Sequence, residues 1–392
     1  MLSFSFTCPT RIVFGCGKHQ EIGALVRPYA SKVLLHFGGG SIYKSGLYDR
    51  VTRSLADAGV AYCELPGVVP NPRVSLVREG MRICREEGVE LILAVGGGSV
   101  IDSAKAISSG LATPEHDVWE LFARGITPNP GIPVATILTL PAAGSEASNS
   151  CVISNEITQQ KYGSKGDFNR PLLSVIDPTL FTTLPKNQIA YGATDMLTHV
   201  MERYFTNTTD TAFIDGLCES TMRTILEYGK RVYEDPSDLD AWGQLALAGT
   251  FAHCDLLGVG REQEWASHKL EHELSARYDI AHGAGLAVLY PGWMRAAWRA
   301  NPARFCDFAV RVMGVSPGAS EEETALCGVA ALEAFFASLD LPNRLSAFGV
   351  DEEGIAIMAK RAVTDEDGGE RRVGFLKRLY EADIRAIYES VR

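Results

Sequence analysis

Five polar residues in the second half of the chain have the types and spacing of metal ligands. Asp195 and His199 are four residues apart, so on a helix their side chains lie on one face, one turn apart. His268 and His272 repeat this spacing, and His282 follows at the predicted start of another helix. Carboxylate and imidazole groups together bind divalent iron, zinc, manganese or nickel. The spacing predicts a divalent metal site and leaves open which of the last three histidines are ligands.

These residues also have an ordinary explanation. An Asp and a His one turn apart are more often a surface pair, and only the three further histidines within fifteen residues favour a metal. His36 and His116 lack such a pattern and are expected to be structural or exposed. His253, beside Cys254, is expected to pack as an ordinary helix residue.

Two identical Gly-Gly-Gly-Ser segments, 38–41 and 96–99, follow apolar runs that are typical of buried strands. Glycines there allow a tight turn that brings backbone N–H groups and the N-terminus of the next helix close to a phosphate. Ser99 and Asp102 also match a capping box, so an ordinary helix start is the alternative explanation. Two such loops on neighbouring βαβ units favour a nucleotide site, although neither matches the GxGxxG pattern.

The elements that must position these loops alternate along the first half of the chain. Apolar runs predict strands at 33–37, 61–65, 91–95 and 134–140, separated by helical patterns at 45–58, 73–87 and 99–111. This alternation is typical of βαβ units with a parallel sheet. A loop of small residues, 139–146, follows the last strand and is expected at the same edge of the sheet.

After Pro185 the pattern becomes helical, with apolar periodicities at 245–257, 286–299 and 321–339. We therefore expect an α/β dinucleotide-binding domain over residues 1–185 and an all-helical, metal-binding domain over 186–392. A length of 392 residues suits two separate cores. The alternation of Leu2, Phe4 and Phe6 predicts an N-terminal edge strand with one apolar face.

Composition narrows the class of partner. A net charge of −11 disfavours nucleic acid and anionic membrane surfaces, but it does not repel a neutral small molecule. Nine cysteines without a CxxC pair suit a reducing compartment. The chain shows neither a signal-peptide pattern nor a run of roughly 18 apolar residues, so we expect a cytoplasmic protein.

The ordered set of motifs resembles the iron-containing (group III) alcohol dehydrogenase family, close to its butanol dehydrogenase and aldehyde reductase branch. The resemblance covers essentially the whole chain, through Phe14-Gly15, Gly38–Ser41, Asn71-Pro72, Gly96–Ser99 with Asp102, Thr139–Glu146, Asp177-Pro178, Leu184-Pro185, Asp195/His199/Glu202 and His268/His272/His282-Gly283. It implies a dehydroquinate synthase-like architecture, with a Rossmann-like nucleotide site on a parallel sheet and an all-α C-terminal domain.

The resemblance also implies roles for individual residues. Asp195, His199, His268 and His282 would hold iron or zinc, and His272 would be a catalytic residue near the nicotinamide and the reacting carbonyl. The implied cofactor residues are Gly38, Gly39, Gly40, Ser41, Asn71, Gly97, Gly98, Ser99, Asp102, Thr139, Ser145, Lys161 and Leu184. Lys161 has a second interpretation as a solvated lysine in a polar hairpin.

Two positions bear on the coenzyme. NAD-preferring relatives often have an Asp where this chain has Gly40, so the chain resembles members that prefer NADP(H), with NAD(H) as the alternative. Ala143 replaces a Thr of many relatives, which removes one hydrogen bond to the cofactor.

The implied reaction is hydride transfer between NADP(H) and a small primary alcohol or aldehyde such as butanol or butanal, in a homodimer. Alternatives on the same fold are a glycerol-type polyol dehydrogenase and a dehydroquinate-synthase-like lyase. The lyase needs basic side chains for an anionic substrate, and the metal segments have few. A non-catalytic nucleotide- and metal-binding protein is the remaining alternative, and the complete ligand set argues against it.

Overall fold

The computed structural model describes residues 1–365 and 368–392 and divides into two compact units. The α/β unit comprises residues 7–184 and 236–250, and the helical unit comprises residues 1–6, 185–235 and 251–392. The main division falls between Leu184 and Pro185. Residues 1–6 belong to the helical unit and residues 236–250 to the α/β unit, and the sequence pattern indicates neither assignment. Segment 236–250 packs on the rest of the α/β unit through Trp242, whose ring lies against that of Phe181 with 5.5 Å between the centroids.

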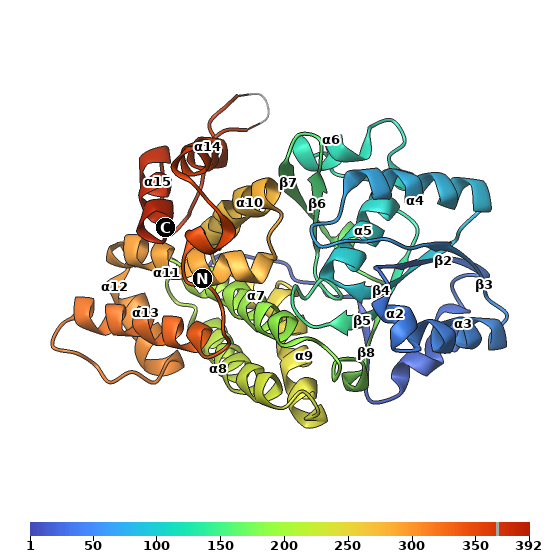
Figure 1. Cartoon of the computed structure of the whole chain (residues 1–392), viewed down its shortest axis with the longest axis horizontal. Coiled ribbons are helices and arrows are strands. Elements are labelled where there is room, and N and C mark those ends of the chain that lie inside the picture. Colours follow the sequence, from blue (N-terminus) through green and yellow to red (C-terminus); the bar gives the residue numbers. More distant parts are fainter. Residues whose placement is uncertain (366–367) are drawn as a thin grey trace. The chain divides into compact units, whose positions relative to one another are not determined.

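A six-stranded parallel sheet in the order β1-β8-β5-β4-β2-β3 forms the α/β unit (Figure 1). Its strands are β1 (Arg11–Phe14), β2 (Lys32–Phe37), β3 (Ala61–Leu65), β4 (Leu91–Gly97), β5 (Val134–Leu140) and β8 (Leu173–Ile176). The chain runs from β2 to β3 on one side and returns to β4 on the other side of β2. The strand order therefore reverses between β2 and β4, which is where open α/β sheets bind ligands.

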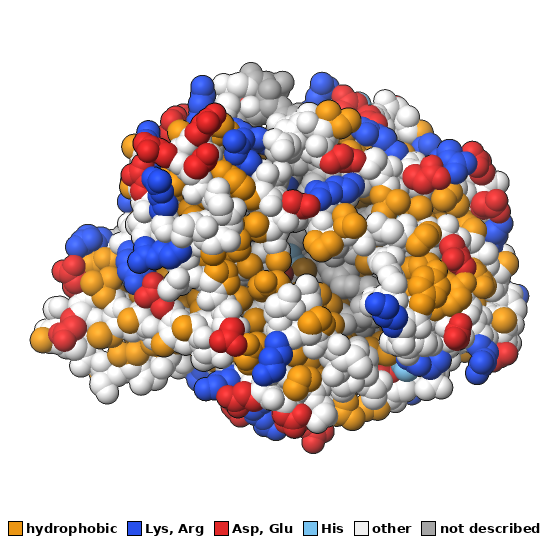
Figure 2. Space-filling view, viewed as in Figure 1, with side chains coloured by type: hydrophobic (Ala, Val, Ile, Leu, Met, Phe, Trp, Pro, Cys, Tyr) orange, Lys and Arg blue, Asp and Glu red, His pale blue; other side chains and the backbone are white. Residues whose placement is uncertain are grey.

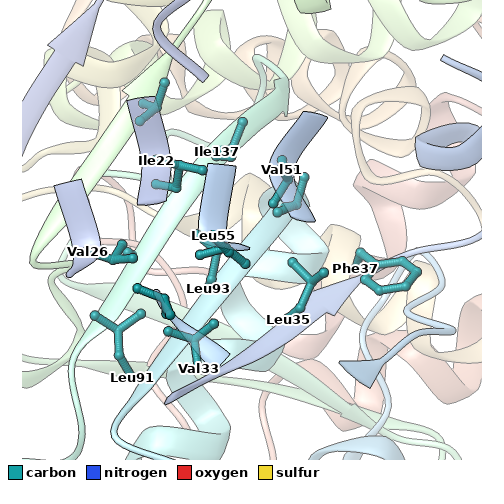
Figure 3. Packing of buried hydrophobic residues seen from close by; sticks show 14 of the residues in the cluster. Ile22, Val26, Val33, Leu35, Phe37, Val51, Leu55, Leu91, Leu93 and Ile137 are labelled. Atoms are coloured by element: carbon teal, nitrogen blue, oxygen red, sulfur yellow. The ribbon is translucent and has the colours of Figure 1, made fainter. Parts of the chain in front are cut away.

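Helices cover both faces of this sheet, with α3 and α4 on opposite faces in Figure 1. One face packs on α1 (Ile22–Val26) and α3 (Leu47–Asp57) through a buried apolar cluster, in which Leu35 and Leu93 lie near Leu55 (Figure 3). On the other face His36 meets Ser103 of α5 (Gly98–Ala112), with 2.8 Å between Nε2 and Oγ. The remaining elements are α2 (Ser41–Lys44), α4 (Val74–Glu87), α6 (Val118–Ala123) and the antiparallel hairpin β6 (Ser150–Asn155) and β7 (Gln160–Lys165).

The four predicted strands are confirmed, but two local predictions are wrong. Helix α5 begins at Gly98, so Ser99 does not cap it, and the carboxylate of Asp102 bonds to Ser145 and Val152 instead. Within the described residues the first strand starts at Arg11, so the alternation at Leu2–Phe6 forms no strand. An alternating segment becomes a strand only when another strand supplies hydrogen bonds, and Leu2 finds a single backbone partner, Gly260.

Helix α11 makes contacts with several other helices of the helical unit. The helices of this unit are α7 (Lys186–Tyr204), α8 (Ala212–Glu234), α10 (Ala266–Tyr278), α11 (His282–Ala297), α12 (Pro302–Asp307), α13 (Glu321–Ala337), α14 (Glu352–Ala362) and α15 (Glu381–Ser390), while α9 (Leu239–His253) crosses the division at Thr250. Helix α11 contacts α7, α10, α13 and α15. Helix α7 is buried on all sides from Gly192 onwards, as expected for a central helix.

Surface composition agrees with a protein that carries many charges of both signs. Figure 2 shows Lys and Arg side chains interspersed with Asp and Glu side chains over the face that is drawn. Among the described residues, none of the helices combines the length and apolar character of a membrane span.

Candidate metal and cofactor sites

Three helices of the helical unit bring the four predicted ligands together. Helix α7 carries Asp195 and His199, α10 carries His268, and α11 begins at His282. Asp195 Oδ1 lies 3.5 Å from His199 Nδ1, 3.9 Å from His268 Nε2 and 3.6 Å from His282 Nε2. Ligand atoms about 2.1 Å from a tetrahedral cation are themselves about 3.4 Å apart. Each of the three ring nitrogens therefore lies near the Asp195 oxygen, and ligand atoms of Asp195, His268 and His282 all lie within 4.8 Å of one another, a group that does not include His199.

The hydrogen bonding of these atoms tests whether a cation fits. Asp195 Oδ1, His199 Nδ1 and His268 Nε2 are buried and have no hydrogen-bond partner in the described part of the chain. Buried polar atoms nearly always have a partner, so three orphaned atoms in one place are unusual. A divalent cation would satisfy all three, and one carboxylate with three imidazoles is a suitable donor set for iron or zinc.

A glycine allows α11 to approach α7 closely enough for this arrangement. A Cβ atom at Gly283 would lie 2.2 Å from the backbone oxygen of Tyr191. Any larger residue would have to push α11 away from α7. Because His282 precedes this glycine and Asp195 is one turn beyond Tyr191, the close contact places the two ligands side by side.

Two further carboxylates face the outer nitrogens of the ligand histidines. His268 Nδ1 lies 2.8 Å from Glu202 Oε1, which also accepts a hydrogen bond of 3.2 Å from the backbone N–H of His268. Glu271 meets His282 Nδ1 in the same way. A carboxylate on Nδ1 holds the proton there and leaves Nε2 free for a metal. The sequence pattern predicted no role for either Glu202 or Glu271.

Burial and neighbouring charges set the ionisation of the ligands. Burial lowers the pKa of His199 well below its usual value, which keeps this imidazole neutral. Burial also opposes protonation of His268, but the carboxylates of Asp195 and Glu202 outweigh it and raise the pKa to about 9. For Asp195 burial favours the neutral acid, yet His282 and His268 outweigh it and lower the pKa. Asp195 is therefore ionised at neutral pH, as a metal ligand must be, whereas His268 is protonated and would release a proton when a metal binds.

The buried guanidinium group of Arg203 and the ring of His253 lie against His199. The ring of His253 is 4.0 Å from the ring of His199, centroid to centroid. Arg203, only 1% exposed, donates a 2.7 Å hydrogen bond to the backbone oxygen of His199, lies 3.2 Å from His253 Nδ1 and stacks over Trp265. His253 thus packs directly on a candidate ligand and also contacts Arg203. Nothing in the local sequence indicates this, since the contact joins distant segments.

His272 occupies a separate position beside His282. It is half-buried on α10, and its ring centroid is 5.7 Å from that of His282. His272 groups with Glu271 and His282, whereas Asp195, His268 and His282 form the other group of potential ligand atoms within 4.8 Å of one another. The structure therefore separates His272 from the Asp195 group, a distinction that helical spacing left open.

The predicted phosphate loops follow β2 and β4, which are adjacent strands of the α/β unit. Gly39 and Gly40 are exposed, and a Cβ atom at either would meet nothing within 4 Å. The second loop is tightly packed, since a Cβ at Gly98 would lie 2.7 Å from the Cβ of Ala143. Ser41 is exposed at the start of α2, and Ser99 is half-buried in the first turn of α5. The loop after β2 thus has open space around Gly39 and Gly40, whereas the loop after β4 packs closely against the segment at Ala143.

Two side-chain pairs connect the remaining cofactor candidates. Ser145 Oγ donates a 2.5 Å hydrogen bond to Asp102 Oδ1, and Lys161 Nζ donates a 3.0 Å hydrogen bond to Asn71 Oδ1. Lys161 is only 8% exposed, so its interpretation as a solvated surface lysine is wrong. Gly97 packs against the side chain of Leu140. Thr139 is half-buried near the end of β5, and Leu184 is half-buried at the end of the segment 7–184.

Lys105 is a buried lysine on α5 for which the sequence pattern predicted no role. Its ammonium group donates hydrogen bonds to the backbone oxygens of Ser148, at 3.2 Å, and Ser150, at 2.9 Å. Burial lowers its pKa, and Asp102 one turn away counteracts part of this effect. Lys105 therefore anchors the segment that follows Ser145, and it stabilises the position of that candidate residue.

Comparison with known proteins gives consistent results over both units. Residues 9–178 match the family described as iron-containing alcohol dehydrogenase, and residues 189–391 match the C-terminal domain of that family. The chain is 39% identical to NADH-dependent butanol dehydrogenase A of Clostridium acetobutylicum and 33% identical to NADPH-dependent aldehyde reductase YqhD of Escherichia coli, in each case over 100% of both chains.

Solved structures of related proteins have the same fold. The crystal structure of NADH-dependent butanol dehydrogenase A from Thermotoga maritima superposes with a TM-score of 0.95 at 38% identity, covering 100% of this chain and 99% of that one. The family match spans nearly the whole chain, and the relatives are alcohol dehydrogenases and aldehyde reductases. The chain therefore belongs to the iron-containing alcohol dehydrogenase family and is an oxidoreductase that interconverts alcohols and aldehydes.

Proposed function

We propose that this enzyme is an NADP(H)-preferring aldehyde reductase for small aldehydes such as butanal, with a divalent metal held by Asp195, His199, His268 and His282. The observation that carries the proposal is that Asp195 Oδ1 lies within 3.9 Å of a ring nitrogen of each of the three histidines. Three of these atoms, Asp195 Oδ1, His199 Nδ1 and His268 Nε2, are buried without a hydrogen-bond partner in the described residues. Iron is the metal that the family name indicates, and zinc suits the same donors.

The bound metal supplies Lewis-acid polarisation of the substrate oxygen, and the nicotinamide supplies the hydride. Asp195 contributes a single negative charge among neutral imidazoles, so the ligand set leaves a divalent ion electrophilic. Glu202 holds His268 with its proton on Nδ1 and its Nε2 toward Asp195. We propose that a ring nitrogen of His272, which is half-buried beside His282, passes a proton to the oxygen of the reduced substrate.

Our proposal for the cofactor uses the loops of the α/β unit. The N-termini of the helices after β2 and β4 favour phosphate groups, through Gly38, Gly39, Gly40, Ser41, Gly97, Gly98 and Ser99. The pairs Asp102–Ser145 and Asn71–Lys161, with Thr139 and Leu184, are assigned to the ribose and the nicotinamide end.

The coenzyme preference rests on Gly40. Relatives in this branch differ, because the butanol dehydrogenases are named NADH-dependent and the Escherichia coli reductase NADPH-dependent. Gly40 places no carboxylate beside a ribose 2′-phosphate, and the space around it is open. These features favour NADP(H), with NAD(H) as the alternative.

We further propose a cytoplasmic homodimer. The nine cysteines of the chain are all free thiols, as in a reducing compartment. Met1, Leu2 and Phe4 are each about half exposed, and such an apolar N-terminal segment suits contact with a second copy.

The test is an absorbance assay with purified enzyme loaded with Fe²⁺ or Zn²⁺. We expect butanal to be reduced with stoichiometric loss of NADPH, more efficiently than with NADH, and we expect chelation of the metal to abolish the reaction. Absence of net NADPH consumption with every aldehyde of a panel would exclude the proposal, since the lyase alternative regenerates its cofactor. Faster turnover of glycerol than of butanol would instead favour a polyol dehydrogenase.

A further inference from the structure

Glu271 is a buried carboxylate at a contact between two helices. It lies on α10, its side chain is fully buried, and it meets Nδ1 of His282 at the start of α11. The hydroxyl group of Ser275, one turn further along α10, donates a hydrogen bond to its other oxygen. Burying a carboxylate is costly unless such partners are present, so its place beside His282 requires an explanation.

The fold leaves space for this carboxylate through a glycine. A Cβ atom at Gly285 would lie 2.9 Å from Cγ and 3.0 Å from Oε1 of Glu271. Gly285 is the fourth residue of α11, one turn from His282 on the same side. Helices α10 and α11 thus enclose the Glu271 carboxylate beside the imidazole.

His282 and His268 have the same surroundings. In each, Nδ1 faces a fully buried carboxylate, Glu271 or Glu202, while Nε2 faces Asp195 Oδ1, at 3.6 Å for His282 and 3.9 Å for His268. Glu202 has a second contact, to the backbone N–H of His268, whereas among the described residues Glu271 is the carboxylate that pairs with His282 Nδ1.

We propose that Glu271 is a positioning residue of the metal site. Its carboxylate accepts a hydrogen bond from Nδ1–H of His282 and holds the ring in the tautomer and orientation that direct Nε2 toward Asp195. The inference rests on the proposed metal site. A carboxylate in this position also makes the imidazole a stronger donor to the metal.

The competing interpretation is a second cation held by Glu271, His272 and His282. Ligand atoms of these three residues lie within 4.8 Å of one another. The two interpretations exclude each other, because Nδ1 of His282 cannot donate a proton to Glu271 and bind a cation with the same lone pair. The number of metal ions per chain therefore distinguishes them.

The experiment measures Zn²⁺ affinity and stoichiometry in metal-free enzyme by competition with a chromophoric chelator. E271L removes the acceptor, E271D retains the charge but withdraws the carboxylate, and E271Q retains an oxygen acceptor. E273Q is the matched control, because Glu273 is a buried acid on the same helix that pairs with Arg361 at 3.1 Å. Circular dichroism establishes that each variant is folded.

We expect one Zn²⁺ per chain throughout, with binding weakened about 10–100-fold in E271L and E271D. E271Q should lose less affinity, and E273Q should bind like the unaltered enzyme. Unchanged affinity in E271D and E271L, or a second Zn²⁺ that these variants lose, would overturn the inference. Because Zn²⁺ affinity is read without turnover, a Glu271 effect in an enzyme that reduces no aldehyde would count against the proposed function alone.

Discussion

At the scale of single residues, both ring nitrogens of the candidate ligand His268 face groups of the proposed metal site. Its Nε2 is buried without a hydrogen-bond partner in the described residues, and its Nδ1 is hydrogen-bonded to the buried carboxylate of Glu202. We expect H268A to bind metal at least about 100-fold more weakly and to lose nearly all aldehyde reduction, while it remains folded. Elemental analysis and turnover check this, with H116A as a control at a partly exposed histidine outside the candidate site. Full metal content with normal turnover in H268A would remove it from the ligand set.

A second residue-scale prediction concerns Gly40 and the coenzyme. An Asp fits there without strain, because the φ angle is −71° and nothing lies within 4 Å of a Cβ atom. Its carboxylate would repel a 2′-phosphate, so G40D should lower kcat/KM for NADPH by about tenfold or more and change NADH use much less. G40A controls for the added Cβ. If G40D leaves the NADPH/NADH ratio unchanged, the argument for NADP(H) fails.

At the scale of elements, the packing of the β4–α5 turn against the loop after β5 decides the geometry of the predicted nucleotide site. A methyl group at Gly98 would lie 2.7 Å from the Cβ of Ala143, so G98A must separate the two segments. Overpacking of this kind costs about 1–3 kcal/mol, and we expect an increase of about tenfold in the KM for NADPH. G216A on α8, where a Cβ meets nothing within 4 Å, should leave the KM unchanged. Equal KM values in G98A and G216A would contradict the assignment of this loop.

At the scale of the whole molecule, the metal is expected to contribute to folding stability. It would bind only the folded state, in which residues from three helices converge, and this stabilises by about 2.7 kcal/mol at a concentration of 100 Kd. For a folding unit of this size the gain corresponds to a rise in Tm of roughly 5–10 °C. Scanning calorimetry of the chelator-treated enzyme, before and after addition of Zn²⁺, measures the shift. An identical Tm in both states would indicate that the four groups do not share an ion.

Much of the fold can be predicted from local patterns. The runs at 33–37, 91–95 and 134–140 are strands, because continuous apolar segments between helical patterns are buried on both faces of a parallel sheet. The segment 61–65 is the edge strand β3 and is partly exposed. Predictions failed for polar side chains whose hydrogen-bond partners lie far away in the sequence. Asp102 bonds to Ser145 rather than capping α5, and Lys161 is buried against Asn71 rather than solvated. These partners lie 43 and 90 residues away, beyond the reach of any local rule.

The same division applies to the candidate metal site. Helical periodicity by itself determined that Asp195 and His199 share one face and that His268 and His272 share another, because residues four apart lie one turn apart. Glu202 and Glu271 each follow a histidine by three residues, yet each bonds to a histidine on a different helix. Only the tertiary structure decided those pairings, and for Glu271 and His282 it did so through helix packing that Gly285 permits. Helical spacing can place side chains on a face, but which groups meet depends on how closely two backbones approach.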